Sequence, residues 1–422
     1  MAYIPEGGDW RDLPEHLKKE AMGGSWDSPG GRTSFFRRLH RHRPAPTIVG
    51  SPTQKSTMLG HPTENRPLTL EECAALQSYP PFVMPRSAMQ YPNHTVLDLF
   101  AGTGVGVAIR DLGAKEFGVE IMPEACETRA ANGFETVYND VWDAHLAEGL
   151  QFDTLWASPP CQTFSLAGSG AGRKALDDVL SVIAAGKYKD MDELRAAAKA
   201  MGDERIGLVL SPLHYVHRFN PTFVAFEQVP PVLPVWEAMV AELESFGYSV
   251  WTGVLSSEQY GVPQVRKRAI LIARRDGIQA APPVPTHSKY NGRNPDDVQE
   301  GVQKWVSMAE ALGWDEDTLV GFPRRADAGK TVTLAGQEYR ARDLFPAAGP
   351  AQAVTGKSRS WNRYADGKPV KVTADEVAQL QSYPGGMDWR GSATKQYLQV
   401  GNAVPPLLAR AVLQAVWAGT EG

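Results

Sequence analysis

The residue with the clearest capacity for chemistry is Cys161, which ends the run Pro159-Pro160-Cys161. The apolar residues 152–157 before it predict a buried strand. Ligands of open α/β sheets bind beyond the carboxyl ends of the strands, so we expect this thiol at a ligand-binding edge. The two prolines favour a stiff, extended approach to it. A nucleophilic thiolate is one interpretation, and a small buried apolar side chain is the other.

Acidic side chains lie at the ends of other predicted strands. Glu120 ends the strand-like residues 117–121, and Glu227 ends the apolar run 221–227. Asp140 follows a third strand-like segment, where it could accept a hydrogen bond from an adenine amino group or cap a helix. Because parallel strands place their carboxyl ends at one edge of a sheet, we expect these acids and the thiol to converge.

A glycine-rich turn, residues 101–106, lies between the predicted strand 95–100 and a helix that begins at Val107. Glycine allows the backbone to approach a ligand closely, and an acid about twenty residues further on can bind ribose hydroxyls. Glu120 has that position. An ordinary tight turn is the alternative, but the succession of strand, turn, helix, strand and acid favours a nucleoside-type cofactor.

Three long polar side chains alternate where a turn leads into the apolar strand 269–273. They are Gln264, Arg266 and Arg268. Side chains alternate between the two faces of a strand, so we expect all three on one face. We predict that this face lies outside the hydrophobic core.

Composition indicates an ordinary globular protein. The 422 residues are 42% hydrophobic and 22% charged, which allows two or three domains. The net charge of -5 does not indicate a nucleic-acid binder. Basic residues nevertheless cluster in segments 32–43 and 266–275, either of which could contact phosphates or form a solvated surface.

Cysteine usage and hydropathy indicate the compartment. Cys73, Cys126 and Cys161 lie far apart, which argues against a disulfide framework or a structural zinc site and fits a reducing cytosol. The sequence shows neither a signal peptide nor an apolar run near the ~18 residues of a membrane span. We therefore expect a soluble, cytoplasmic protein with no membrane contact and no metal.

The order of the elements predicts an α/β fold with a smaller, irregular domain. Strands and helices alternate through residues 93–275, whereas residues 276–394 lose this rhythm. A capping box at residues 373–376 predicts a helix. Residues 395–422 end in an apolar helix, and residues 1–90 contain little core-forming material, so we predict an accessory module there.

An internal repeat links the two ends of the chain. Residues 68–80 match residues 372–384, and both copies end in Gln-Ser-Tyr-Pro. Residues 43–50 resemble residues 349–356. Only the second copy continues into the segment 401–406.

Taken together, these residues resemble a DNA (cytosine-5)-methyltransferase of prokaryotic or phage type. The resemblance covers about residues 93–422, and its motifs are specific as an ordered set: Asp98-Leu-Phe-Ala-Gly-Thr-Gly104, Pro159-Pro-Cys161, Glu227-Gln-Val229, Gln264-Val-Arg-Lys-Arg268 and Gly401-Asn-Ala-Val-Pro-Pro406. It implies a Rossmann-like catalytic domain at 93–275, completed by 395–422. It also implies a target-recognition domain at 276–394, S-adenosylmethionine as methyl donor and double-stranded DNA as partner.

The chemistry of such a reaction fits the residues. Cytosine C5 is a poor nucleophile, so the Cys161 thiolate is expected to add to C6 first. Glu227 would then protonate or hydrogen-bond N3, Arg268 would bind O2, and Arg266 would orient the Cys161 loop. Because C6 cannot be reached inside a stacked duplex, we expect the target base to flip out.

The resemblance also implies the cofactor contacts. Glu120 would bind the ribose hydroxyls, Met122 would pack near the adenine, and Asp140 would contact its amino group. The expected cofactor-binding residues are Phe100, Gly102, Gly104, Glu120, Met122, Asp140, Pro159 and Asn402.

Two features depart from the family pattern. Gln228 follows Glu227 where the family usually has asparagine, and the segment between Cys161 and Arg205 is long and helical. Methylation of a tRNA cytosine and a catalytically silent DNA-binding relative are the alternatives. The size of segment 276–394 favours DNA, and the intact catalytic residues favour an enzyme.

The partners and the accessory module complete the expectations. We expect a monomer that acts on DNA, with which a cognate restriction endonuclease could be paired. Residues 1–90 resemble the recognition portion of another enzyme of this type. They therefore predict a fused second recognition module or its remnant.

Overall fold

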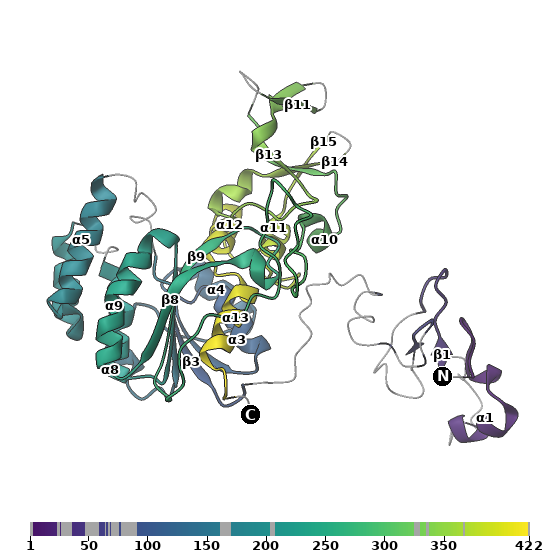
Figure 1. Cartoon of the computed structure of the whole chain (residues 1–422), viewed down its shortest axis with the longest axis horizontal. Helices are drawn as coiled ribbons and strands as arrows, with labels where there is room; N and C mark the ends of the chain where they lie inside the picture. The colour runs from purple at the N-terminus through teal and green to yellow at the C-terminus, as the bar shows by residue number, and fades with distance from the viewer. Residues whose placement is uncertain are drawn as a thin grey trace. The chain divides into compact units, whose positions relative to one another are not determined.

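The computed structural model describes residues 3–22, 26, 36–46, 59–63, 65, 68, 76, 91–160, 170–202, 207–324, 330–334, 337–365 and 368–420. The chain divides into two compact units, Met1–Pro85 and Arg86–Gly422 (Figure 1). Within the described ranges, no helix is both long enough and apolar enough to cross a membrane.

The first unit is small. It contains helix α1 (Glu15–Met22) and two short parallel strands, β1 (Arg37–Arg38) and β2 (Leu59–Gly60). Its core is a cluster of three buried leucines, Leu39, Leu59 and Leu68. Most of the first copy of the repeat, residues 68–80, lies outside the described residues.

The second unit is built on a seven-stranded sheet of order β5-β4-β3-β6-β7-β9-β8. Neighbours from β5 to β7 are parallel, whereas β9 is antiparallel to both β7 and β8. The predicted Rossmann-like fold with a mixed, mostly parallel sheet is confirmed. The strands are β3 (Thr95–Leu99), β4 (Lys115–Val119), β5 (Thr136–Tyr138), β6 (Thr154–Ala157), β7 (Phe223–Gln228), β8 (Ser249–Ser256) and β9 (Lys267–Arg274).

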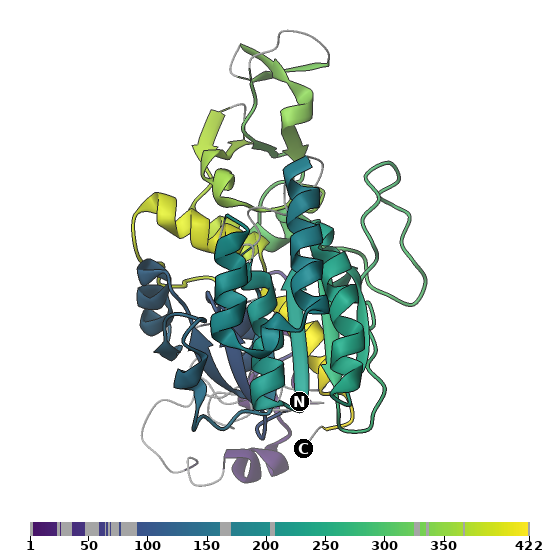
Figure 2. The ribbon, with the colours of Figure 1, turned by 90° about the vertical axis from the view of Figure 1, so that its left-hand side faces the viewer.

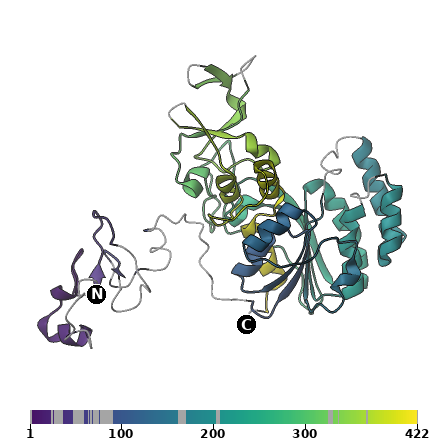
Figure 3. The same cartoon turned by 180° about the vertical axis from the view of Figure 1, so that it is seen from behind.

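Helices cover both faces of this sheet (Figure 3). Successive side chains of a strand enter opposite cores, so Leu155 and Ala157 join one cluster while Trp156 joins the other. The first core is closed by α5 (Gly170–Ala184), α6 (Met191–Ala200), α8 (Ser211–Phe219) and α9 (Leu233–Ser245), which Figure 2 shows in front of the sheet. The second is closed by α3 (Gly104–Asp111) and α13 (Pro406–Val416).

The region after β9 is irregular, as the loss of α/β rhythm predicted. It contains a four-stranded antiparallel sheet of order β13-β10-β14-β15 and the hairpin β11-β12. Its elements are α10 (Met308–Leu312), β10 (Leu319–Gly321), β11 (Thr331–Leu334), β12 (Gln337–Arg340), β13 (Leu344–Pro346), β14 (Asn362–Ala365) and β15 (Lys368–Lys371).

The C-terminal helices return to the large sheet. The predicted capping box of α11 (Ala374–Leu380) is confirmed, since Thr373 Oγ1 accepts from the Glu376 N–H and the Thr373 N–H donates to Glu376 Oε2. Helix α12 (Ala393–Asn402) follows, and α13 packs against α3. The Trp417 indole then donates to Thr154 Oγ1 over 2.9 Å, which anchors the chain end to β6.

Candidate active site

The strand order reverses at β3. The chain passes from β3 to β4 and β5 on one side, and then returns to β6 and β7 on the other. Such a reversal leaves a crevice beyond the carboxyl ends of the two central strands. The glycine-rich turn follows β3, and Pro159 and Pro160 follow β6. Two of the predicted site segments therefore flank one crevice.

The glycine-rich turn has a backbone that few residues other than glycine tolerate. Gly102 has φ 47°, and even Phe100 has φ 61°. A Cβ added at Gly102 would meet nothing within 4 Å, so space is open there. A Cβ at Gly104 would lie 2.0 Å from the Val404 carbonyl oxygen. The turn is thus open at Gly102 and packed against the C-terminal motif at Gly104, while Asn402 is exposed at the end of α12.

Glu120 joins this turn to the end of β4. One of its carboxylate oxygens accepts from the Gly102 N–H over 2.9 Å, and the other accepts from the Met122 N–H over 2.8 Å. Asp140 follows β5 and accepts from the Trp142 N–H over 3.0 Å. The next helical turn, Ala144–Ala147, has Asp143 at its N-cap. Asp140 is therefore not a helix cap, and that alternative is wrong.

Glu227 and Arg268 form an ion pair. Arg268 Nε lies 2.6 Å from Glu227 Oε1, and 13% and 7% of the two side chains are exposed. Glu227 is near the end of β7, and Arg268 is near the start of the antiparallel neighbour β9. The antiparallel pairing brings these two ends to the same edge of the sheet. The two residues predicted to contact cytosine N3 and O2 are therefore held side by side.

Cys161 and the loop 161–169 lie outside the described residues, so the position of the thiol stays a prediction. The backbone segment that leads to Cys161 is held by Gln228, the residue that departs from the family pattern. The Gln228 amide nitrogen donates to the Pro159 carbonyl, and its oxygen accepts from the Val229 N–H over 2.5 Å. Gln228 thus fixes the backbone two residues before Cys161.

The prediction that Gln264 and Arg266 lie outside the core is wrong. They are 0% and 4% exposed. Gln264 donates to the Leu380 carbonyl and to Gln381 Oε1, and it accepts from the Val354 N–H over 2.7 Å. Arg266 donates to three carbonyls, those of Val354, Gly401 and Ala403. Burial is tolerated because loops distant in sequence supply these partners.

Arg266 keeps its charge in this setting. Burial and the nearby Arg268 lower the pKa of Arg266 to about 9, which still leaves it protonated at neutral pH. Its described hydrogen bonds reach residues 354, 401 and 403. Its expected role toward the Cys161 loop concerns residues outside the described part and stays a prediction.

Sequence reasoning missed the role of the repeated Gln-Ser-Tyr segment. Tyr383 shares a 2.8 Å hydrogen bond with Thr103 Oγ1 in the glycine-rich turn, and burial raises the pKa of Tyr383. Gln381 donates to the Val400 carbonyl, and Ser382 accepts from the Leu407 N–H. The second copy of the repeat therefore braces the turn and the C-terminal motif. The repeat itself was the available signal.

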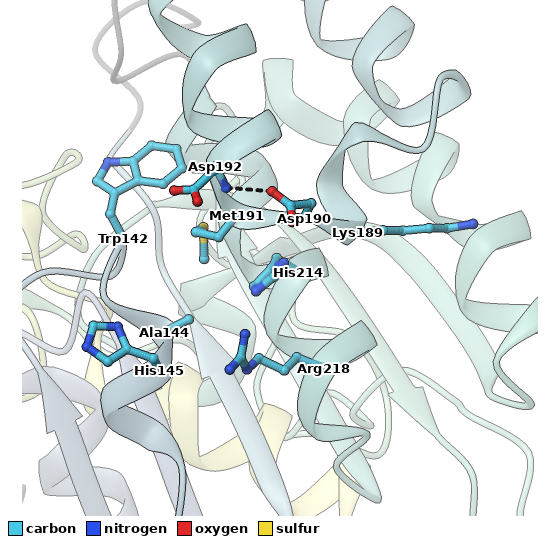
Figure 4. Close-up of a pocket in the computed structure, with 9 residues that line it drawn as sticks. All are labelled: Trp142, Ala144, His145, Lys189, Asp190, Met191, Asp192, His214 and Arg218. Carbon is cyan, nitrogen blue, oxygen red and sulfur yellow. Dashed lines mark hydrogen bonds between the residues drawn. The ribbon is translucent and has the colours of Figure 1, made fainter.

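A separate pocket lies on the face of the sheet that α6 and α8 cover (Figure 4). It is a polar cavity of about 250 Å³ that contains none of the predicted site residues. In the described part of the chain, no three His, Cys, Asp or Glu side chains are grouped to hold a metal ion. The pocket is lined by Trp142, Ala144, His145, Lys189, Asp190, Met191, Asp192, His214 and Arg218.

The chain is similar to known methyltransferases. Type II methyltransferase M1.HphI of Haemophilus parahaemolyticus is 28% identical over 350 residues, which are 76% of this chain and 86% of that protein. Type II methyltransferase M.PspPI of a Psychrobacter species is 49% identical over 80 residues, 19% of each chain.

Solved structures share the fold. The Entamoeba histolytica methyltransferase EhMeth has a TM-score of 0.50 at 14% identity and covers 78% of this chain and 99% of its own. The S. pombe Dnmt2 methyltransferase has the same TM-score and identity, with 77% and 98% covered. The family model described as C-5 cytosine-specific DNA methylase matches residues 94–417. The chain belongs to the C-5 cytosine-specific DNA methylase family.

Proposed function

We propose that the protein transfers a methyl group from S-adenosylmethionine to C5 of a flipped-out cytosine in a short sequence of double-stranded DNA. The observation that carries this proposal is the Glu227–Arg268 pair, 2.6 Å apart at the carboxyl edge of the sheet. The pair flanks β6, the strand that leads to Cys161, and β3 with its open glycine-rich turn lies on the other side of β6.

The glycine-rich turn fits S-adenosylmethionine. Open space at Gly102 leaves room for a ligand against the backbone. Each Glu120 oxygen accepts one N–H, so lone pairs remain for ribose hydroxyls. When bound, S-adenosylmethionine supplies an electrophilic methyl group. The residues that would hold it are Phe100, Gly102, Gly104, Glu120, Met122, Asp140, Pro159 and Asn402.

The catalytic residues act on the cytosine ring. The Cys161 thiolate adds to C6, and the ring electrons move toward N3. Glu227, once it has taken a proton from solvent, gives that proton to N3 or donates a hydrogen bond to it. Arg268 binds O2, and its ion pair with Glu227 keeps both groups aimed at the base. C5 of the resulting enamine would take the methyl group of S-adenosylmethionine, and S-adenosylhomocysteine would be the leaving group. Loss of the C5 proton to a base then expels the thiolate and restores the aromatic ring.

Transfer of labelled methyl groups tests this function. Wild-type protein should label duplex DNA and leave tRNA unlabelled. The Cys161→Ser variant should transfer no label yet bind S-adenosylmethionine with unchanged affinity, because the thiol is not a cofactor contact. Label in tRNA alone would support the RNA alternative, and no label in either would indicate a silent relative. Bisulfite sequencing of labelled DNA would give the recognition sequence.

We further propose that residues 276–394 recognise the target sequence and that residues 1–90 are a second recognition module. The internal repeat supports this, because its second copy, residues 372–384, belongs to segment 276–394, and the first unit also carries the basic segment 32–43. Deleting residues 1–85 should weaken DNA binding or change the preferred sites in bisulfite maps. Unchanged DNA affinity and site preference would reject a recognition role.

A further inference from the structure

Arg129 lies beneath the glycine-rich turn and was not marked by any motif. It is part of α4 (Pro123–Ala131) and is 0% exposed. Its Nη1 donates to the Gly102 carbonyl over 2.8 Å and to Glu116 Oε1 over 3.0 Å. Its Nη2 donates to the Glu135 carbonyl over 2.6 Å, and its Nε donates to Thr136 Oγ1 over 3.0 Å. A single guanidinium thus connects the turn, β4 and β5.

The surrounding backbone makes room for this guanidinium. A Cβ at Gly118, in β4, would lie 1.9 Å from Arg129 Nη2 and 2.4 Å from its Cζ. A glycine in a strand often marks such a close approach. Glu116, the acidic partner of Arg129, is packed in turn against Gly106 of α3, where an added Cβ would lie 2.9 Å from its Oε2.

Two acidic side chains, those of Asp98 and Glu116, lie near the Arg129 guanidinium. Asp98 is fully buried, and neither of its carboxylate oxygens has a hydrogen-bond partner among the described residues. Burial, and then the negative charge of Glu116, raise the pKa of Asp98, whereas Arg129 opposes this rise. A proton on Asp98 leaves Glu116 and the half-buried Glu120 as the acids whose charges act on Arg129. The ion pair with Arg129 offsets the cost of burying the Glu116 carboxylate.

The hydrogen bonds of Arg129 and Glu120 hold Gly102 from both sides. The Gly102 N–H donates to Glu120, and its carbonyl accepts from Arg129. Two peptide units of the turn are therefore fixed, at the position where the backbone is open to a ligand. Without Arg129, Gly102 would keep its N–H partner but lose the partner of its carbonyl.

We propose that Arg129 is a positioning residue for the cofactor turn, because its bond to the Gly102 carbonyl sets the direction of the peptide groups that face S-adenosylmethionine. This inference rests on the proposed cofactor. It assigns Arg129 no contact with the cofactor or with DNA.

The Arg129→Lys variant tests the role. Lysine keeps the charge but cannot reproduce a planar fork that reaches Gly102, Glu116 and Glu135 together. A hydrogen bond to a charged group contributes enough free energy that losing the bond to the Gly102 carbonyl should weaken cofactor binding. We expect the Kd and KM for S-adenosylmethionine to rise by about tenfold or more. The kcat at saturating cofactor and the Kd for duplex DNA should stay within about twofold of wild type. A general loss of structure would instead change all four quantities.

Gly118→Ala is an independent second variant, because its new methyl group displaces the guanidinium without altering Arg129 itself. It should weaken cofactor binding in the same way. Arg110→Lys is the matched control, since Arg110 lies over the same Phe134 ring as Arg129 but is exposed and donates to the Asn132 carbonyl. That control should bind the cofactor as wild type does.

Isothermal titration with S-adenosylmethionine separates the possible failures, and circular dichroism reports whether each variant is folded. If wild-type protein does not bind the compound, the proposed function fails. If wild type binds and folded Arg129→Lys and Gly118→Ala bind equally well, the positioning role is overturned. A parallel loss of DNA affinity and kcat in both variants would also overturn it.

Discussion

At the scale of single residues, the main feature of the candidate site is the ion pair between Glu227 and Arg268. Glu227 and Arg268 are both largely shielded from water, and each is the ion-pair partner of the other. In the proposed mechanism, a carboxyl group acts at N3 and a guanidinium acts at the exocyclic O2, which is bonded to the neighbouring ring atom C2, so the two side chains have to lie close together. Their adjacency on β7 and β9 meets that need.

Replacing Glu227 by glutamine should slow methyl transfer by about 10²- to 10⁴-fold, since the amide keeps a polar group but cannot donate an acidic proton. Affinity for S-adenosylmethionine should not change. Single-turnover transfer of labelled methyl groups to duplex DNA measures the effect. Glu237→Gln, at an exposed position of α9, is the control and should react at the wild-type rate.

The buried Asp98 predicts a dependence of stability on pH. Its pKa is raised in the folded protein, so the folded state binds its proton more tightly than the unfolded chain does. This contribution to stability is complete below the ordinary aspartate pKa of 3.8 and is lost as pH rises through the raised value.

Asp98→Asn should remove that part of the pH dependence. The Tm of the variant relative to wild type should therefore increase from acid to neutral pH, as followed by circular dichroism. An equal Tm difference at all pH values would show that Asp98 does not titrate in this way.

At the scale of elements, the turn before β9 connects this strand to the C-terminal helices. Gln264 and Arg266 together hold the backbone at residues 354, 380, 401 and 403. A Cβ at Gly401 would lie 2.3 Å from the Gly356 nitrogen, so α12 approaches the same segment closely. These elements must fold together because each satisfies buried polar groups of another.

Gln264→Met should therefore destabilise the protein by about 3 kcal/mol or more, since it keeps the side-chain length but leaves the Val354 N–H and the Leu380 carbonyl without their partner. Urea denaturation measures the free energy of unfolding. Gln299→Met, at an exposed position, should change it by less than about 0.5 kcal/mol. A small effect at Gln264 would mean that water replaces the lost bonds.

At the scale of the whole molecule, the C-terminus is built into the large sheet of the second unit. Trp417 is fully buried, stacks on His94 with ring centroids 4.6 Å apart, and donates to Thr154. His94 in turn lies 2.5 Å from Asp153. The start of β3, the start of β6 and the end of the chain are thus joined at the edge opposite the candidate site.

Trp417→Ala should reduce the free energy of unfolding by about 3–5 kcal/mol, because it leaves a large cavity in the second core. Trp417→Phe should cost less, since it retains most of the packing and loses the bond to Thr154. Chemical denaturation of the two variants measures the difference. Equal losses would show that the hydrogen bond, rather than the packing, dominates.

Features set by local sequence were predicted correctly. Apolar runs predicted the buried strands β3, β6 and β7, and the spacing of Thr373 and Glu376 predicted the start of α11. These elements can be predicted from the sequence because strand formation and helix capping depend on side chains only a few residues apart. The motif order likewise predicted the family to which the chain belongs.

Other features depend on contacts that no local pattern contains. Gln264 and Arg266 look like surface residues in sequence, yet carbonyls 88 to 137 residues away make their burial favourable. Arg129 donates to Gly102, which lies 27 residues earlier in the chain. In the sequence, the only trace of this contact is Gly118, whose lack of a Cβ leaves space for the guanidinium. The sequence by itself determined which chemical groups are present and in what order. Tertiary structure alone decided which of them are paired, because long-range packing supplies the partners of buried polar groups.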